Sequence, residues 1–179
     1  MAGHSVKTPL TTRHGLAGLQ AGIFGALLMV ACMMAGSLLK RRSVWILPNL
    51  FATTFYGSAV YRNQFLRASW SGIALILAIY ALGGVIWGLL WGEERRSLAP
   101  FYGALTGLLV YFVFFNLIWK VANPLLPLYA PTRQLEFAHV LWGLALSRSP
   151  LYSRRIAHAL MPPPVQPHEA EARTGEVIR

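Results

Sequence analysis

The side chains most able to do chemistry lie near the end of the last apolar run of the chain. Glu136 and His139 stand three residues apart in the stretch LEFAHVLWG, and Arg133 precedes them. This Glu-x-x-His spacing is that of one half of a carboxylate-bridged di-iron site in a helical bundle. Such a site needs a second pair and two further carboxylates, but every other acidic residue lies outside the apolar runs. The spacing therefore does not predict a metal centre.

A second polar group comes just before this one in the chain. Asn116, Lys120 and Asn123 follow one another at intervals of four and three residues, so they would share one face of an α-helix. The short loop NPLLPLYAP joins this helix to the next and would bring the two polar groups to the same membrane face. We therefore predict one candidate polar cluster, made of Asn116, Lys120, Asn123, Arg133, Glu136 and His139.

Two interpretations of the cluster stay open. A charged side chain near the middle of a membrane costs at least about 2.5–3.5 kcal/mol, so Glu136 is predicted to be ionised and paired with Arg133 or Lys120. The pair would then belong to a structural network that locks two helices together. Alternatively, the cluster is a polar site entered from one face, because intramembrane ionisable groups often mark functional sites. Water access separates them: a packing network is dry, whereas a site has a cavity.

The remaining residues suggest no catalytic chemistry. No nucleophile stands beside a base, and no phosphate-binding glycine loop is visible. The one cysteine, Cys32, allows neither an intramolecular disulfide nor a cysteine-based zinc site. The other histidines lie outside the apolar runs, which argues against a haem held by two histidines. We therefore predict a protein without enzymatic activity and without a catalytic, cofactor-binding or metal site.

The composition indicates that membrane helices position these residues. Hydrophobic residues make up 55% of the chain and charged residues only 12%, whereas a soluble domain carries about 25% charged residues. The net charge is +10, and its basic residues stand in clusters at the ends of apolar runs, as in Lys40–Arg42. Such clusters anchor helices among lipid headgroups. We predict the lipid bilayer as partner and no binding of nucleic acid.

Four apolar runs are expected to cross the membrane. The first is uncharged and, at about 1.5 Å per residue, reaches roughly 37 Å, which is more than a hydrocarbon core of about 30 Å. It is also too long for the apolar core of a cleaved signal peptide. The spans are predicted at 15–39, 71–91, 100–121 and 134–152, the last being the weakest by hydropathy. They form a membrane domain over 15–160, between a polar N-terminal segment (1–14) and a disordered tail (161–179).

The segment 43–66 is expected to form an interfacial or re-entrant helix between the first two spans. It is apolar enough to touch lipid, but Pro48 and Gly57 interrupt it. A fifth full crossing is the alternative. The predicted helix carries a polar stripe at helical spacing, formed by Asn49, Thr53 and Tyr56.

Charge and glycine patterns bear on orientation and assembly. With four crossings, the side that holds both termini carries more basic residues, which predicts cytoplasmic termini; a fifth crossing would reverse this.

Rows of small residues allow helix backbones to approach closely, either within one bundle or across a dimer seam. A homo-oligomer or an unidentified membrane partner therefore stays open. The rows are Gly18, Gly22 and Ala26; Gly84, Gly88 and Gly92; and Gly103 with Gly107.

Three stretches resemble small bacterial multi-pass inner-membrane proteins of uncharacterised activity. They are PNLFATTFYG, NPLLPLYAP, and His139-x-x-Trp142-Gly143, and the likeness spans roughly Gly15 to Tyr152. The resemblance implies an all-α, four-helix fold in the cell inner membrane, with no activity, cofactor or catalytic residue attached. The sequence thus predicts a structural or accessory membrane component. The alternative is a small transporter or channel component that uses the polar cluster for a polar or anionic solute.

Overall fold

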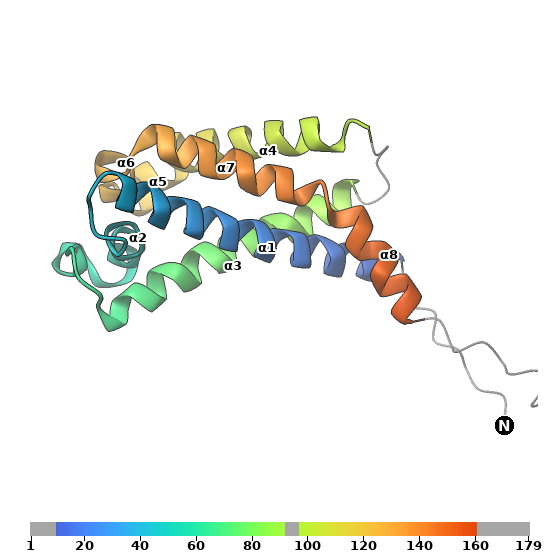
Figure 1. Ribbon diagram of the computed structural model, residues 1–179, viewed down its shortest axis with the longest axis horizontal. Coiled ribbons are helices and arrows are strands. Elements are labelled where there is room, and N and C mark those ends of the chain that lie inside the picture. The colour runs from blue at the N-terminus through green and yellow to red at the C-terminus, as the bar shows by residue number, and fades with distance from the viewer. Residues whose placement is uncertain (1–9, 92–96, 161–179) are drawn as a thin grey trace, which may run out of the picture.

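The computed structural model describes residues 10–91 and 97–160, and within them every regular element is helical (Figure 1). The predicted all-α class is confirmed. The polar segment expected at 1–14 is helical from Leu10 onward, whereas the tail at 161–179 lies outside the described residues. The elements are α1 (Leu10–Leu39), α2 (Ile46–Tyr56), η1 (Ser58–Val60), α3 (Arg67–Trp91), α4 (Ala99–Val113), the π-helical η2 (Phe114–Ile118), α5 (Trp119–Ala122), α6 (Leu125–Tyr129), α7 (Thr132–Leu146) and α8 (Ser149–Ala159).

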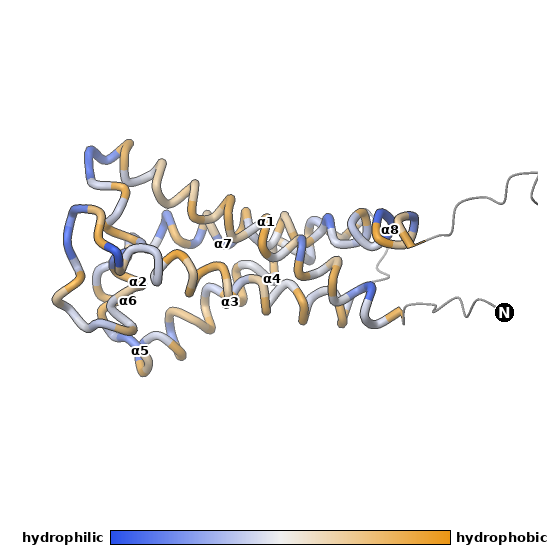
Figure 2. Tube along the Cα trace, turned by 90° about the horizontal axis from the view of Figure 1, so that it is seen from below, coloured by the Kyte–Doolittle hydropathy of each residue, from blue (hydrophilic) through white to orange (hydrophobic). Residues whose placement is uncertain are grey.

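Three helices are long and apolar enough to cross a membrane, which indicates a membrane protein. They are α1, α3 and the continuous helix Ala99–Ala122, which combines α4, η2 and α5. Large apolar side chains on these helices point outward, as expected where lipid rather than water surrounds the protein. Figure 2 shows hydrophobic residues along the length of the bundle and the most hydrophilic ones at its two ends.

The fourth predicted span, 134–152, consists of two helices. α7 has 15 residues, about 22 Å at 1.5 Å per residue, and α8 follows after a turn at Ser147–Arg148. Pro150 stands in the first turn of α8 and has no N–H to donate to the carbonyl of Leu146, so α7 cannot continue through it. α8 instead packs against α1 (Figure 1).

Close approaches between backbones hold the long helices together. α1 packs on α3 and α7, and α4 packs on α7. A Cβ atom added to Gly22 of α1 would lie 2.7 Å from the carbonyl oxygen of Tyr80 and 2.9 Å from the Cα of Gly84, both on α3. Gly103 and Gly107 of α4 meet α7 in the same way, at Gly143 and His139. The predicted glycine rows thus pack within one chain; Gly92 lies outside the described residues.

α2 closes one end of the bundle together with η1, α5 and α6 (Figure 1). Its 11 residues span about 16 Å, too short for the fifth crossing considered above. Of the predicted polar stripe, Asn49 and Thr53 are buried, whereas Tyr56 is exposed. Asn49 points toward the loop after η1, whose carbonyls have no helical partners. Asn49 is fully buried and its Nδ2 donates to the carbonyl oxygens of Arg62 (2.7 Å) and Gln64 (2.9 Å). Its Oδ1 accepts from Ser69 Oγ at 2.6 Å.

Candidate functional site

The six residues of the predicted polar cluster lie in four separate places. His139 is enclosed in the bundle, Asn123 belongs to the hydrogen-bonded end formed with α2, and Asn116 and Lys120 are exposed. Arg133 is exposed and Glu136 half-buried on the first turns of α7. One continuous site of the kind predicted is therefore not formed.

His139 is fully buried, and both of its ring nitrogens are hydrogen-bonded. Its ring nitrogen Nδ1 lies 2.7 Å from the carbonyl oxygen of Leu135, which can only accept, so Nδ1 carries the proton. Nε2 of the neutral ring then accepts from the hydroxyl of Tyr80 at 2.6 Å. This bond joins α7 to α3 across the bundle. Aromatic rings enclose the imidazole at centroid distances of 5.2–5.9 Å: Tyr80, Tyr111 and Phe115.

Asn123 leaves the predicted face because the helix changes form before it. The π-helical turn η2 shifts the register between Asn116 and Lys120, and α5 ends at Ala122. Asn123 has an extended backbone (φ −157°) and donates from Nδ2 to the hydroxyls of Thr53 (2.7 Å) and Thr54 (2.9 Å) on α2. Its role in the structure is to fasten the end of the third long helix to α2.

Asn116 and Lys120 line a small polar pocket of about 210 Å³. The side-chain amide of Asn116 donates to the carbonyl of Phe112 at 3.1 Å and so bonds within its own helix. Tyr111 and Thr132 complete the polar part of the pocket, and Leu135 closes it toward the bundle. The pocket thus reaches two of the predicted residues, whereas His139 lies behind its apolar floor.

The predicted ion pair of Glu136 is not formed. Among residues 10–91 and 97–160, no carboxylate oxygen lies within 4.0 Å of a basic nitrogen, so Glu136 is bonded neither to Arg133 nor to Lys120. The prediction assumed burial in hydrocarbon. α7 begins at Thr132, so Arg133 and Glu136 lie near the end of the bundle. At that position a charged side chain avoids most of the cost of being placed in the middle of a membrane.

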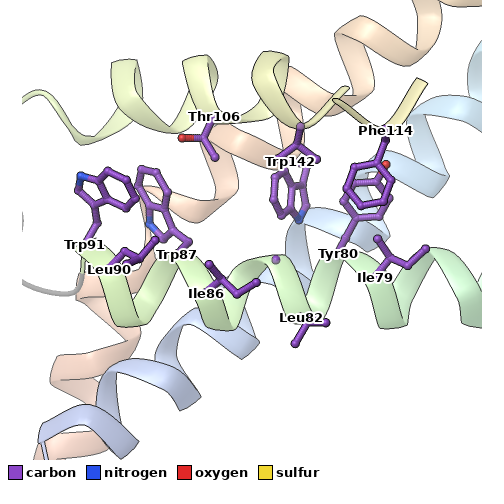
Figure 3. Close-up of a pocket in the computed structure, with 12 residues that line it drawn as sticks. Ile79, Tyr80, Leu82, Ile86, Trp87, Leu90, Trp91, Thr106, Phe114 and Trp142 are labelled. Carbon is purple, nitrogen blue, oxygen red and sulfur yellow. The ribbon is translucent and has the colours of Figure 1, made fainter. Parts of the chain in front are cut away.

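An apolar crevice between α3 and α4 was not predicted. These helices are consecutive in the sequence but do not pack along their lengths, and a cavity of about 340 Å³ lies between them (Figure 3). Trp87 and Trp91 of α3 point toward Thr106 of α4, and the ring of Trp142 from α7 enters the space between the two helices. No sequence signal marks it, because the short Glu93–Arg96 connection suggests a tight hairpin.

Metal binding finds no support from these side chains. Within the described residues, no group of three or more His, Cys, Asp or Glu side chains could hold a metal ion.

No protein-family model, curated protein sequence or solved structure matches this chain. The resemblance to small bacterial multi-pass proteins therefore stays a prediction.

Proposed function

We propose that the protein is a multi-pass component of a cell inner membrane with a structural or accessory role and no catalytic activity. Four crossings are proposed, the fourth made by α7 and continued by α8. Support for the fourth comes from packing, since α7 lies along both α1 and α4. It would return the chain to the side on which α1 begins, with both termini in the cytoplasm.

Labelling of single cysteines from each side of the membrane tests this topology. In a Cys32→Ala background, Gln64→Cys and Leu128→Cys are expected to react from one side, because both residues are exposed at the α2 end of the bundle. Cysteines at positions 94 and 165 are expected to react from the other side. Labelling of 128 and 165 from the same side would contradict the fourth crossing.

The observation that supports a structural role is the hydrogen bonding of His139. A histidine that moves protons or binds a solute needs a nitrogen that water or solute can reach. Here the side chain is fully buried, and Leu135 and Tyr80 occupy both ring nitrogens. Such a bond is suited to hold α3 and α7 in register.

A double-mutant cycle tests that role. Tyr80→Phe and His139→Leu should show a coupling of about 0.6 kcal/mol in unfolding free energy, the average for hydrogen bonds between membrane helices, and no more than about 1.7 kcal/mol. Tyr102→Phe is the matched control, because Tyr102 lies on the outer side of α4 and is partly exposed. Its coupling to His139→Leu should be near zero. Equal coupling for both tyrosines would contradict a specific role for the bond.

A small transporter or channel component for an anionic solute is the second candidate. It is favoured by one observation, the polar pocket of about 210 Å³ beside Lys120. Anion efflux from liposomes that contain the protein, above that of empty liposomes and removed by Lys120→Ala, would support this function. Arg67→Ala, which removes an exposed charge away from the pocket, is the control. Absence of efflux would leave the structural role as the better explanation.

A further inference from the structure

A polar pocket lies at the end of the bundle where α1 ends and where α2 and α7 begin. Its volume is about 270 Å³. Its basic wall is the turn after α1, and polar side chains from the loop before α3 and from α6 and α7 complete it. The side chains that give the pocket its charge and polarity are Lys40, Arg41, Arg42, Asn63, Tyr129 and Gln134.

The charge of this pocket is positive and uncompensated. Three consecutive basic residues line it, whereas the only acidic residue in the described part of the chain, Glu136, does not. Ser43 and Ile46 place the start of α2 at the pocket, and Pro131 and Gln134 place the start of α7 there. The N-terminal end of a helix carries the positive end of its dipole and favours anions. The C-terminal end of α1 carries a partial negative charge of about −0.5, which disfavours an anion. The three full positive charges of the basic residues that follow it are larger than this partial charge.

The backbone of the basic turn is unusual. α1 ends in a Schellman motif, in which Arg41 N–H donates to Leu38 O (2.8 Å) and Arg42 N–H to Ser37 O (2.9 Å). The left-handed position of this motif, which glycine normally occupies, is held by Arg41 at φ 53°. Among the described residues no other side chain is attached at positive φ. Strained residues of this kind gather at binding sites. The strained backbone of Arg41 therefore coincides with a pocket that Arg41 itself lines.

The wall opposite the basic turn is held in place by a hydrogen bond between helices. Gln134 Nε2 donates to the carbonyl oxygen of Met33 at 2.6 Å and so ties the first turn of α7 to the last turns of α1. Ser37, which also lines the pocket, donates its hydroxyl to the same carbonyl at 3.0 Å. The wall formed by Gln134 is therefore held in place relative to α1.

We propose that this pocket binds the phosphate of an anionic phospholipid headgroup. The ligand chemistry follows from the cations, since arginine side chains and helix N-termini are the usual partners of phosphate. The choice of a lipid rather than a free anion follows from the position. α1 is uncharged and apolar from Gly15 to Leu39, so the turn after it lies where the hydrocarbon ends and the phosphates of the bilayer begin. The inference rests on membrane insertion and not on the accessory role.

The test measures binding of short-chain phosphatidylglycerol to the full chain in a neutral detergent, with short-chain phosphatidylcholine as the uncharged comparison. Native mass spectrometry gives the bound fraction of each lipid. The wild-type protein is expected to hold one phosphatidylglycerol at least tenfold more tightly than phosphatidylcholine. Equal affinity for the two lipids would overturn the proposal.

Matched variants separate a site from general attraction between a basic protein and an acidic lipid. Arg42→Gln removes a pocket cation, and Arg67→Gln removes an exposed cation at the same end of the bundle but outside the pocket. General attraction reduces affinity about fivefold for each cation lost, whichever it is. The proposal predicts at least a tenfold loss for Arg42→Gln and less than a twofold loss for Arg67→Gln. Equal losses would overturn it.

Arg41→Gly distinguishes a loss of lipid affinity caused by the missing guanidinium from a loss caused by misfolding. Glycine relieves the left-handed backbone, so this variant should melt at or above the wild-type temperature while its affinity for phosphatidylglycerol falls. Unchanged affinity would overturn the role of Arg41 in the site. Inorganic phosphate is the final comparison: if it displaces phosphatidylglycerol at equal concentration, the natural ligand is a soluble anion, and the lipid assignment is wrong.

Discussion

Gly84→Ala tests the seam between α1 and α3. A Cβ at this position would overlap the carbonyl oxygen of Gly18 and would lie 2.6 Å from Gly22 Cα and 2.9 Å from Gly22 N. All three atoms belong to backbone, so no side chain can rotate away. The two helices would have to separate until these contacts reach ordinary van der Waals distances.

The expected magnitude combines two opposing effects. Inserting a methyl group into a packed region costs about 1–3 kcal/mol. Alanine favours the helix over glycine by up to about 1 kcal/mol. The net loss should be about 0–2 kcal/mol, which lowers the melting temperature by up to about 8 °C in a chain of this size. Thermal unfolding in one detergent, followed by circular dichroism, measures it.

Gly15→Ala is the matched control on the same seam. Its Cβ would lie 3.6 Å from Leu89 Cδ2, an ordinary contact with a flexible side chain. This variant keeps the helical benefit without the overlap, so its melting temperature should equal or exceed that of the wild type. If Gly84→Ala and Gly15→Ala have the same melting temperature, the close approach of α1 and α3 is refuted. If Gly84→Ala instead alters only the association state, the row is a dimer seam.

Three further results are expected. Asn49→Leu should destabilise the α2 end by about 1–3 kcal/mol, because it removes the buried amide that bonds the carbonyls of Arg62 and Gln64; faster hydrogen exchange confined to this end would show it. Glu136→Lys should cost less than about 1 kcal/mol in detergent melting, since the carboxylate is half-buried and unpaired; a larger loss would restore the ion pair predicted from the sequence. Ile86→Trp should fit into the crevice of about 340 Å³ and leave the melting temperature within about 4 °C of the wild type; a larger fall would mean that α3 and α4 close on each other in the membrane.

Hydropathy predicted the long helices well because the chain is apolar over their whole length. α1 and α3 extend the first two expected spans by a few residues, and the third matches Ala99–Ala122 closely. The division of the fourth at Ser147 was readable in principle, since Pro150 follows within three residues. The intramolecular packing of the glycine rows was one of two options that their spacing allowed.

The candidate site could not be predicted from residue spacing alone. The prediction placed Asn116, Lys120 and Asn123 on one helix face, which holds only if the helix is a regular α-helix throughout. The π-helical turn η2 breaks that assumption between Asn116 and Lys120, and nothing in its composition announces it. The partner of His139 was also hidden, because Tyr80 lies on another helix 59 residues earlier in the chain. Pockets between non-adjacent segments depend on tertiary structure, so the crevice and the basic pocket emerge only from the fold.

The separation of α3 from α4 has a consequence for how the protein is made. The main packing partner of α1 is α3, and α2 also packs on α3, so these contacts can form once Trp91 has been synthesised. The third long helix then enters the bilayer without its main partner, because α4 packs on α7 rather than on α3. At about 5–20 residues per second, α7 follows on the order of seconds later. During this interval α4 would lack the helix against which it packs in the folded chain.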